Sequence, residues 1–583
     1  MKKTNKILAA LLSLTMGLGF VGCGSGNDAS GKTTIKVVAY EGGYGYNWVK
    51  ESAKRFEALN ATTSFEKGKT GVYVDIKITK DTDVETMSSS AEDIYFTNGN
   101  ATPRDYSQKG WLVDINDIVT EKIDTRDGVE YSIADKIDED YRVILQNRGD
   151  GHYYGLPYAD YYSGLTYDEE AFTAKKLYFA APDATSKAAY NSPYGTADFL
   201  TAENETSRKS CGIDGKYGTA DDGLPTSLQE LMILCAKIKQ SGYVPFAFPG
   251  GHANYTSLFF EGLWASLAGY EKIRSGYDFT GTVDVVEGYE DEPLFSGINY
   301  IRKPKIKTET VSEAEGYYST QTVERYYALS FIQICQKEGW FAQLTNDTNV
   351  SHTATMGRFL TNGLTSQEKV AMLIEGSYWY NEASDYGEVK KYQVLKEKQT
   401  GEKKAERKVA WMPLPVSVNE TVEERTDGGR NRYTFTQSGS SFAFINARTK
   451  NKGGVLDACK AFLQFTYTDE ELSKRVGMHG VYCTALSHSV AEEDSNKLNY
   501  FQRSVFEAAE NADLVLPSAS NETFLTARTT LSIGGKRYLQ PIDTDGREYT
   551  TIISAIRSGG LTAEEIMNVT MVKAADWGAY YQG

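Results

Sequence analysis

Tyrosine and carboxylate side chains crowd one stretch of the sequence. Residues 153–172 read YYGLPYADYYSGLTYDEEAF, and 155–172 alone hold four tyrosines and a phenylalanine. A tyrosine ring combines a flat apolar face with a hydroxyl group, and a carboxylate accepts hydrogen bonds from pairs of hydroxyls. The segment therefore has the residue types of a polar ligand site, although Tyr153, Tyr154 and Tyr167 also suit an ordinary strand and core.

Two acidic residues keep an enzymatic alternative open. Asp160 and Glu375 qualify as the paired carboxylates of a glycoside hydrolase, which stand about 5–10 Å apart across a sugar bond. No G-x-S-x-G nucleophile motif occurs. The string at 26–33 matches the Walker A pattern, but no strand precedes it and an alternating run follows, so we reject nucleotide binding.

A glycine-punctuated loop, CGIDGKYGTADDG, carries Asp214, Asp221 and Asp222. Hard cations take several oxygen ligands from flexible backbone, so calcium is a candidate structural ion here. The loop lacks the D-x-D-x-D-G order of an EF-hand, and a solvated turn is the alternative. No other cofactor is required by the sequence.

The chain begins with a targeting pattern. Residues 1–22 have a basic start and a short apolar core, and they end before Cys23. The small residues around Cys23 resemble a bacterial lipoprotein signal, with Phe20 in place of the usual leucine. We therefore expect Cys23 to be the lipidated N-terminus and 23–32 to be a flexible tether; a secretory peptide with an incidental cysteine is the alternative.

Composition limits the classes of partner. The 583 residues include 62 basic and 78 acidic side chains, a net charge of −16. Such a balance disfavours nucleic acid and anionic lipid, which are bound through Lys and Arg. The sequence predicts a monomer that touches the membrane through its lipid only. Five cysteines follow Cys23, and helical apolar stripes around Cys235 and Cys335 favour buried thiols over disulfides.

Strand and helix patterns alternate along the chain. Residues 34–40 predict a buried strand, 41–47 a glycine-rich loop and 48–59 a helix; 72–79 and 91–96 predict further strands. The pairs Ser227 with Glu230 and Thr562 with Glu565 predict helix starts. This alternation favours an α/β fold with a mainly parallel sheet, interrupted by polar insertions at about 178–226, 278–320 and 395–432.

An ordered set of motifs resembles one family. The motifs are DIYFTNGN with KGWLVDIND, YYGLPYADYYSGLTYDEEAF, AMLIEGSYWYNEA, WMPLPVS, SGSSFAFINA and DACKAFLQFTYTDEELSKRVG. In this order they are similar to the extracellular solute-binding proteins of ABC transporters, specifically the sugar-binding family that includes maltose-binding protein. The resemblance covers nearly all of 33–583.

The resemblance implies a two-lobed periplasmic-binding-protein-like fold with a ligand cleft between the lobes. Three hinge crossings are expected near 156–162, 371–377 and 438–445. Lobe one would comprise 33–157 plus 376–437, and lobe two 158–375 plus 438–583. The implied function is capture of a sugar by lobe closure and its delivery to a permease.

A tyrosine-rich hinge segment suits a saccharide, because a pyranose has apolar C–H faces and a rim of hydroxyls. The length and aromatic content of the chain favour an oligosaccharide. Trp264 and Trp379 are the expected stacking platforms. The complete set of expected ligand contacts is Tyr44, Tyr46, Asn98, Asp160, Tyr161, Tyr162, Trp264, Glu375, Ser377, Tyr378, Trp379, Ser438 and Ser440.

Overall fold

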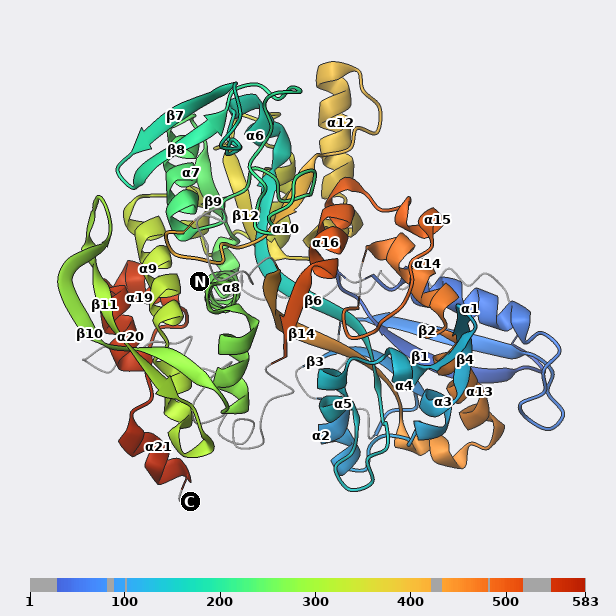
Figure 1. The fold of residues 1–583 in the computed structure, drawn as a ribbon. Helices are drawn as coiled ribbons and strands as arrows, with labels where there is room; N and C mark the ends of the chain where they lie inside the picture. Colours follow the sequence, from blue (N-terminus) through green and yellow to red (C-terminus); the bar gives the residue numbers. More distant parts are fainter. Residues whose placement is uncertain are drawn as a thin grey trace, which may run out of the picture.

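Two groups of secondary-structure elements lie side by side and share one sheet (Figure 1). The computed structural model describes residues 29–43, 45–80, 89–99, 102–420, 432–480, 483–516 and 547–581. Cys23 and Tyr44 lie outside the described residues, as do the side chains of Ser438 and Ser440. Among the described helices, none has the length and hydrophobicity that a membrane span requires.

Lobe one is built around the first three strands of the chain. Its elements are β1 (Thr33–Tyr40), α1 (Asn47–Leu59), β2 (Val72–Thr79), β3 (Ile94–Gly99), α2 (Pro103–Gln108), α3 (Asn116–Thr120), β4 (Lys122–Arg126), β5 (Val129–Ser132), α4 (Ile133–Lys136), α5 (Glu139–Leu145), the 3-10 helix Ala447–Asn451, α13 (Gly454–Phe465), α14 (Asp469–His479) and α15 (Glu492–Ser495). The strands predicted at 34–40 and 72–79 and the helix at 48–59 are confirmed, while the strand expected at 91–96 begins three residues later.

Lobe two holds the longer middle part of the chain and its C-terminal helices. Its elements are α6 (Glu169–Lys175), β7 (Lys187–Ser192), β8 (Gly195–Leu200), α7 (Leu228–Gln240), β9 (Val244–Ala247), α8 (Tyr255–Asp278), β10 (Thr282–Phe295), β11 (Ile298–Thr310), α9 (Val323–Lys337), α10 (His352–Leu360), β12 (Val370–Gly376), α11 (Trp379–Asp385), α12 (Glu388–Thr400), β13 (Val409–Met412), α16 (Tyr500–Glu510), β15 (Ala512–Val515), α19 (Ile552–Gly559), α20 (Ala563–Thr570), α21 (Ala574–Tyr581) and the 3-10 helices Gly250–His252, Glu313–Thr320 and Gln343–Asn346. Both predicted capping boxes are present, at α7 and α20. Two of the polar insertions contain the hairpins β7–β8 and β10–β11.

Two long strands, β6 (Leu156–Asp168) and β14 (Tyr433–Ile445), connect the lobes. The shared sheet has the order β2-β1-β3-β14-β6-β12-β9, with β13 on β6 and β15 on β14. β1 pairs in parallel with β2 and β3, but β6 and β14 run antiparallel to each other, and β14 is antiparallel to β3. The α/β class is confirmed, whereas the sheet is mixed, because β6 is antiparallel to β12 and β14, and β14 is antiparallel to β3.

The packing of the cores corrects the expected lobe boundaries. Core residues from 35 to 159 and from 442 to 486 form one cluster, and Trp379, Tyr392 and Trp411 pack in lobe two. β12 pairs with β6 and β9 inside lobe two, so the chain does not cross at 371–377. The third crossing instead lies between α15 and α16. An apolar strand reads the same in sequence whether it crosses a hinge or stays within a lobe.

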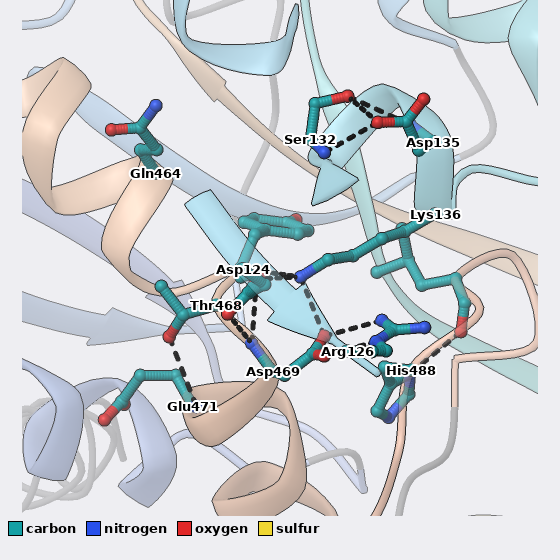
Figure 2. Close-up of polar contacts among 12 residues, drawn as sticks. Asp124, Arg126, Ser132, Asp135, Lys136, Gln464, Thr468, Asp469, Glu471 and His488 are labelled. Atoms are coloured by element: carbon teal, nitrogen blue, oxygen red, sulfur yellow. Dashed lines mark hydrogen bonds and ion pairs between the residues drawn. The ribbon is translucent and has the colours of Figure 1, made fainter. Parts of the chain in front are cut away.

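A buried ion-pair network fixes the returning segment 454–487 in lobe one (Figure 2). The Lys136 ammonium, whose side chain is fully buried, contacts Asp124 and lies 2.8 Å from the Asp469 carboxylate. Arg126 donates to Asp469 at 2.7 Å and to the Ser487 carbonyl oxygen at 2.9 Å. These contacts join β4 and α4 to the start of α14, so separated parts of the chain form one lobe.

The cysteines behave as the sequence predicts. Cys211, Cys235, Cys335, Cys459 and Cys483 are all buried, and the structure joins none of these described residues in a disulfide. Burial raises the pKa of the Cys235 and Cys335 thiols well above its usual range. They pack as small apolar groups in the core.

Candidate ligand-binding site

Three tyrosines from three elements meet between the lobes. Tyr161 lies midway along β6, Tyr255 starts α8, and Tyr378 immediately precedes α11. The rings of Tyr161 and Tyr378 lie 5.2 Å apart at 88°, and the hydroxyls of Tyr255 and Tyr378 are hydrogen-bonded. All three side chains are half-buried. We call this group the tyrosine cluster.

Lobe one contributes polar groups to the same place. Asn98 lies near the carboxyl end of β3, and its amide oxygen accepts a 3.5 Å hydrogen bond from the Tyr161 hydroxyl. Tyr46, also half-buried, precedes α1, and burial followed by the charges of Asp385 and Glu41 raises its pKa. Ligands of open α/β sheets gather at the carboxyl ends of strands. Asn98, Tyr161, Glu375 and Tyr378, which were expected from the sequence, lie close together. Their contact with a ligand stays a prediction, as does that of Tyr46.

The lobes approach each other closely beside the tyrosine cluster. A Cβ atom added at Gly43 would stand 2.6 Å from the Tyr378 ring, so a larger residue in this loop would push the lobes apart. The Asn381 amide donates to the Gly43 carbonyl oxygen at 2.9 Å and to the His479 carbonyl oxygen at 2.7 Å. Gln502 in turn donates to Asn381 at 2.8 Å. The glycine-rich loop of lobe one is thereby tied to α11 of lobe two.

Acidic side chains line the lobe-two side of the site. Glu375 is the penultimate residue of β12 and is 1% exposed, and burial raises its pKa well above the usual range. Burial also raises the pKa of Glu382 to about 7, against the opposing effect of Lys80. Both carboxyls act electrostatically on Tyr255 and Tyr378. The site therefore combines aromatic faces, hydroxyls, an amide and carboxyls.

Asp160 belongs to the opposite face of β6. Its carboxylate accepts hydrogen bonds from the Tyr141 hydroxyl at 2.5 Å, the Thr484 hydroxyl at 3.1 Å and the Ala485 N–H at 3.2 Å. Successive side chains of a strand point to opposite faces, so Asp160 and Tyr161 cannot contact one ligand from the same side. This placement corrects the expectation that Asp160 lies in the ligand site.

A cavity of about 520 Å³ between the lobes also lies on the Asp160 side. Tyr141 and Thr484 line it, and Asp140 accepts hydrogen bonds from Tyr270 at 2.9 Å and Arg274 at 3.1 Å beside it. We favour the tyrosine cluster as the ligand site, because it joins aromatic faces to a buried carboxyl at the ends of strands. Among the described residues that line the cavity, the aromatic side chains are Tyr141 and Tyr270, and no ring contact between them is seen.

Three aromatic residues expected at the ligand are core residues. Trp379 is fully buried, and its indole N–H donates to Thr166 Oγ1 at 2.9 Å. Trp264 is 3% exposed and donates to Thr322 Oγ1 at 2.9 Å. Tyr162 is 2% exposed, with its ring 4.6 Å from Phe435. These placements correct the prediction that Trp379 and Trp264 are stacking platforms and that Tyr162 contacts ligand.

Ser377 has a backbone role beside the site. Its N–H donates to the Tyr162 carbonyl oxygen at 2.9 Å, and its hydroxyl accepts from the Tyr162 N–H at 3.3 Å. The pair continues the β12–β6 register past Gly376 and so positions Tyr378.

The aspartate loop uses its carboxylates for its own turns. Asp221 accepts from the Ile213 N–H at 2.6 Å, Asp214 from the Lys216 N–H at 2.8 Å and Asp222 from the Gly218 N–H at 2.7 Å. Within the described ranges, no three His, Cys, Asp or Glu side chains are grouped as a metal ion would require. The three carboxylates thus stabilise the turn, and calcium binding by this loop stays a prediction.

Two residues of the site escaped the sequence analysis. Tyr255 follows the Pro249-Gly250-Gly251 turn after β9, and that strand-end position was the available signal. Glu382 lies one helical turn after Tyr378, and only the geometry of α11 shows that it reaches the same place. Tyr44, Ser438 and Ser440 stay predictions, since their side chains lie outside the described part of the chain.

Comparisons with known proteins identify the family of this chain. The family model described as bacterial extracellular solute-binding protein matches residues 46–472. A solved chitin oligosaccharide binding protein is 14% identical, with a TM-score of 0.52 over 94% of this chain and 99% of its own. A solute-binding protein, RafE, solved in complex with raffinose, is 12% identical, with a TM-score of 0.49 over 94% of this chain and 100% of its own. The search of curated proteins finds no match. The match over more than half of the chain shows that this protein belongs to the bacterial extracellular solute-binding protein family.

Proposed function

We propose that the protein binds an oligosaccharide between its lobes and delivers it to the permease of an ABC transporter. The observation that carries the proposal is the tyrosine cluster, which meets Asn98 and Glu375 between two lobes joined by β6 and β14. Aromatic rings match the apolar faces of a sugar, while the amide and carboxyl match its hydroxyls. A ligand held by both lobes favours their closure, because it binds the closed form better than the open one.

Tyr378 is the proposed stacking platform. Its ring is half-buried, it touches Tyr161 edge to face, and it lies against the Gly43 loop of the other lobe. Tyr46, Asn98, Tyr161 and Glu375 are the proposed polar contacts around it.

A lipid on Cys23 would hold the protein on the outer face of the cell membrane. The tether 23–32 leads into β1, which begins at Thr33. The lipid and the permease partner are proposed from the leader pattern and the family.

Binding without catalysis fits the site better than hydrolysis does. The two candidate acids, Asp160 and Glu375, have separate partners: Asp160 is held by Tyr141 and Thr484, whereas Glu375 acts on Tyr255 and Tyr378. A hydrolase needs both carboxyls at one glycosidic bond.

A glycan array followed by calorimetry tests the proposal, with the tether removed. We expect tight binding of at least one oligosaccharide, and the ligand should be recovered intact after prolonged incubation. At 100 times its dissociation constant the ligand should stabilise the fold by about 2.7 kcal/mol. Failure to bind any saccharide would contradict the function, and shortened products that track the purified protein would favour the hydrolase.

A further inference from the structure

The Glu375 carboxyl is buried without a counter-charge. Its Oε2 accepts a 3.0 Å hydrogen bond from the Gly376 N–H, and its Oε1 has no hydrogen-bond partner among the described residues. Apart from burial, the Gly376 N–H and the Glu382 carboxyl are the groups that shift the pKa of Glu375, and neither is a cation. A buried carboxyl in this state is costly, since buried charges are normally paired and hydrogen-bonded.

The surroundings of Glu375 are aromatic and negative. The charge of Glu375 acts on Tyr255 and Tyr378, and Tyr161 packs edge to face on Tyr378. The carboxyl of Glu382 lies on the same side. Ring faces carry negative potential, so tyrosines beside a carboxylate form an environment that attracts cations. The two tyrosines are half-buried. Glu375 is 1% exposed, so a ligand reaches its carboxyl only after a neighbouring side chain changes rotamer.

The described basic side chains in the neighbourhood of Glu375 and Glu382 do not supply a free cation to Glu375. Lys80, which lowers the pKa of Glu382, donates a hydrogen bond to the Tyr386 hydroxyl. Burial, followed by the charges of His252 and Lys80, lowers the pKa of His352, which disfavours its cationic form. The described side chains around Glu375 therefore offer it no compensating cation.

We propose that this part of the site binds a protonated amine on the sugar, with the ammonium held by Glu375 and by the ring faces of Tyr255 and Tyr378. The inference rests on the proposed function and narrows its ligand to saccharides that carry free amino groups. An ammonium has three donors and supplies both the charge and the hydrogen bond that Glu375 Oε1 lacks. An N-acetylated or unsubstituted sugar supplies no charge, so it leaves Glu375 unpaired.

The proposal has a consequence for protons. In the unliganded site, burial favours the protonated carboxyl of Glu375. When an ammonium binds, the carboxylate form becomes favourable, and the proton leaves to the buffer while the amine keeps its own. Binding of an amino sugar near neutral pH should therefore release up to about one proton, whereas a neutral sugar should release none.

The test begins with a glycan array that presents amino sugars beside their N-acetylated and neutral counterparts at matched linkages. We expect the best ligands to carry free amines, with an affinity about tenfold or more above their N-acetylated partners. Calorimetry of the best amino ligand in two buffers of different ionisation enthalpy then measures the proton release.

Two matched variants complete the test. Glu375→Gln should abolish both the amine preference and the proton release, with the melting temperature reporting that the fold is kept. Glu261→Gln is the control, because burial also raises the pKa of Glu261, to about 7, but its charge acts on Tyr277 of the lobe-two core. Neutral or N-acetylated sugars as best ligands, or an unchanged preference in Glu375→Gln, would overturn the inference and leave the function standing. Absence of binding to every saccharide would overturn the function and the inference with it.

Discussion

Two consecutive residues, Tyr378 and Trp379, should respond in opposite ways to truncation. Trp379 is fully buried, its ring contacts Phe359, Tyr380 and Phe501, and its N–H bonds to Thr166. Replacing such a tryptophan with alanine costs about 3–5 kcal/mol of folding stability. At about 2 °C per kcal/mol for a large domain, the melting temperature of lobe two should fall by roughly 6–10 °C. The affinity of the Trp379→Ala variant for saccharide, measured well below that melting temperature, should stay at the wild-type value.

Tyr378 has the opposite profile, because its ring is half-buried at the site. Tyr378→Ala should weaken saccharide binding about tenfold or more, through lost stacking and lost contact area. Tyr378→Phe is its control: it keeps the ring and removes only the hydroxyl bond to Tyr255, so most of the affinity should remain.

Differential scanning fluorimetry and calorimetry on the three variants separate the two roles. The reasoning fails if Tyr378→Ala binds as tightly as wild type. It fails equally if Trp379→Ala loses affinity while keeping its melting temperature, since that result would place the indole at the ligand.

Three further predictions concern stability. Chelation should leave the melting temperature unchanged, and a stabilising effect of added calcium would contradict this. Asp221→Ala should lower the free energy of unfolding by about 1–3 kcal/mol, because it removes the carboxylate that accepts from the Ile213 N–H; denaturant titration measures the loss. Asp469→Ala should destabilise lobe one by about 3–5 kcal/mol in the same assay, because it leaves the buried Lys136 ammonium with fewer partners, and a loss under 1 kcal/mol would refute the network's importance. The folded-state pKa of Glu382, about 7, lies above its unfolded value, so this residue makes the fold less stable as pH rises from about 4.5 to 7. Glu382→Gln should therefore raise the melting temperature at pH 8 and have little effect near pH 4, and equal shifts at both would disprove the assignment.

Local patterns predicted the elements well and their partners poorly. The strands at 33–40 and 72–79 and both capping boxes depend on neighbours in sequence, so the sequence is sufficient to place them. Which lobe contains 379–416 depends on the pairing of β12 with β6 and β9, and no local signal encodes that pairing. The mixed sheet escaped prediction for the same reason.

The candidate site shows a similar limit at single-residue scale. Asp160, Tyr161 and Tyr162 are consecutive polar or aromatic residues, and only strand alternation tells which of them faces the lobes' meeting point. Tyr161 does so, while Asp160 and Tyr162 have partners elsewhere. A tryptophan is the stronger stacking residue in general, but Trp264 and Trp379 lie on helices, where position along the face decides burial.

Buried residues whose polar groups lack partners are the more informative ones about function. Trp379 satisfies its indole N–H and packs on three rings, so its burial explains its presence in full. The burial of Glu375 has no such explanation, because this penultimate residue of a fully buried strand has one carboxyl oxygen without a hydrogen-bond partner among the described residues. A protein that tolerates such a cost in its folded state commonly does so at a functional site. The missing counter-charge and hydrogen-bond partner of the Glu375 carboxyl are therefore better evidence for the place and charge of the ligand than the abundance of aromatic residues around it.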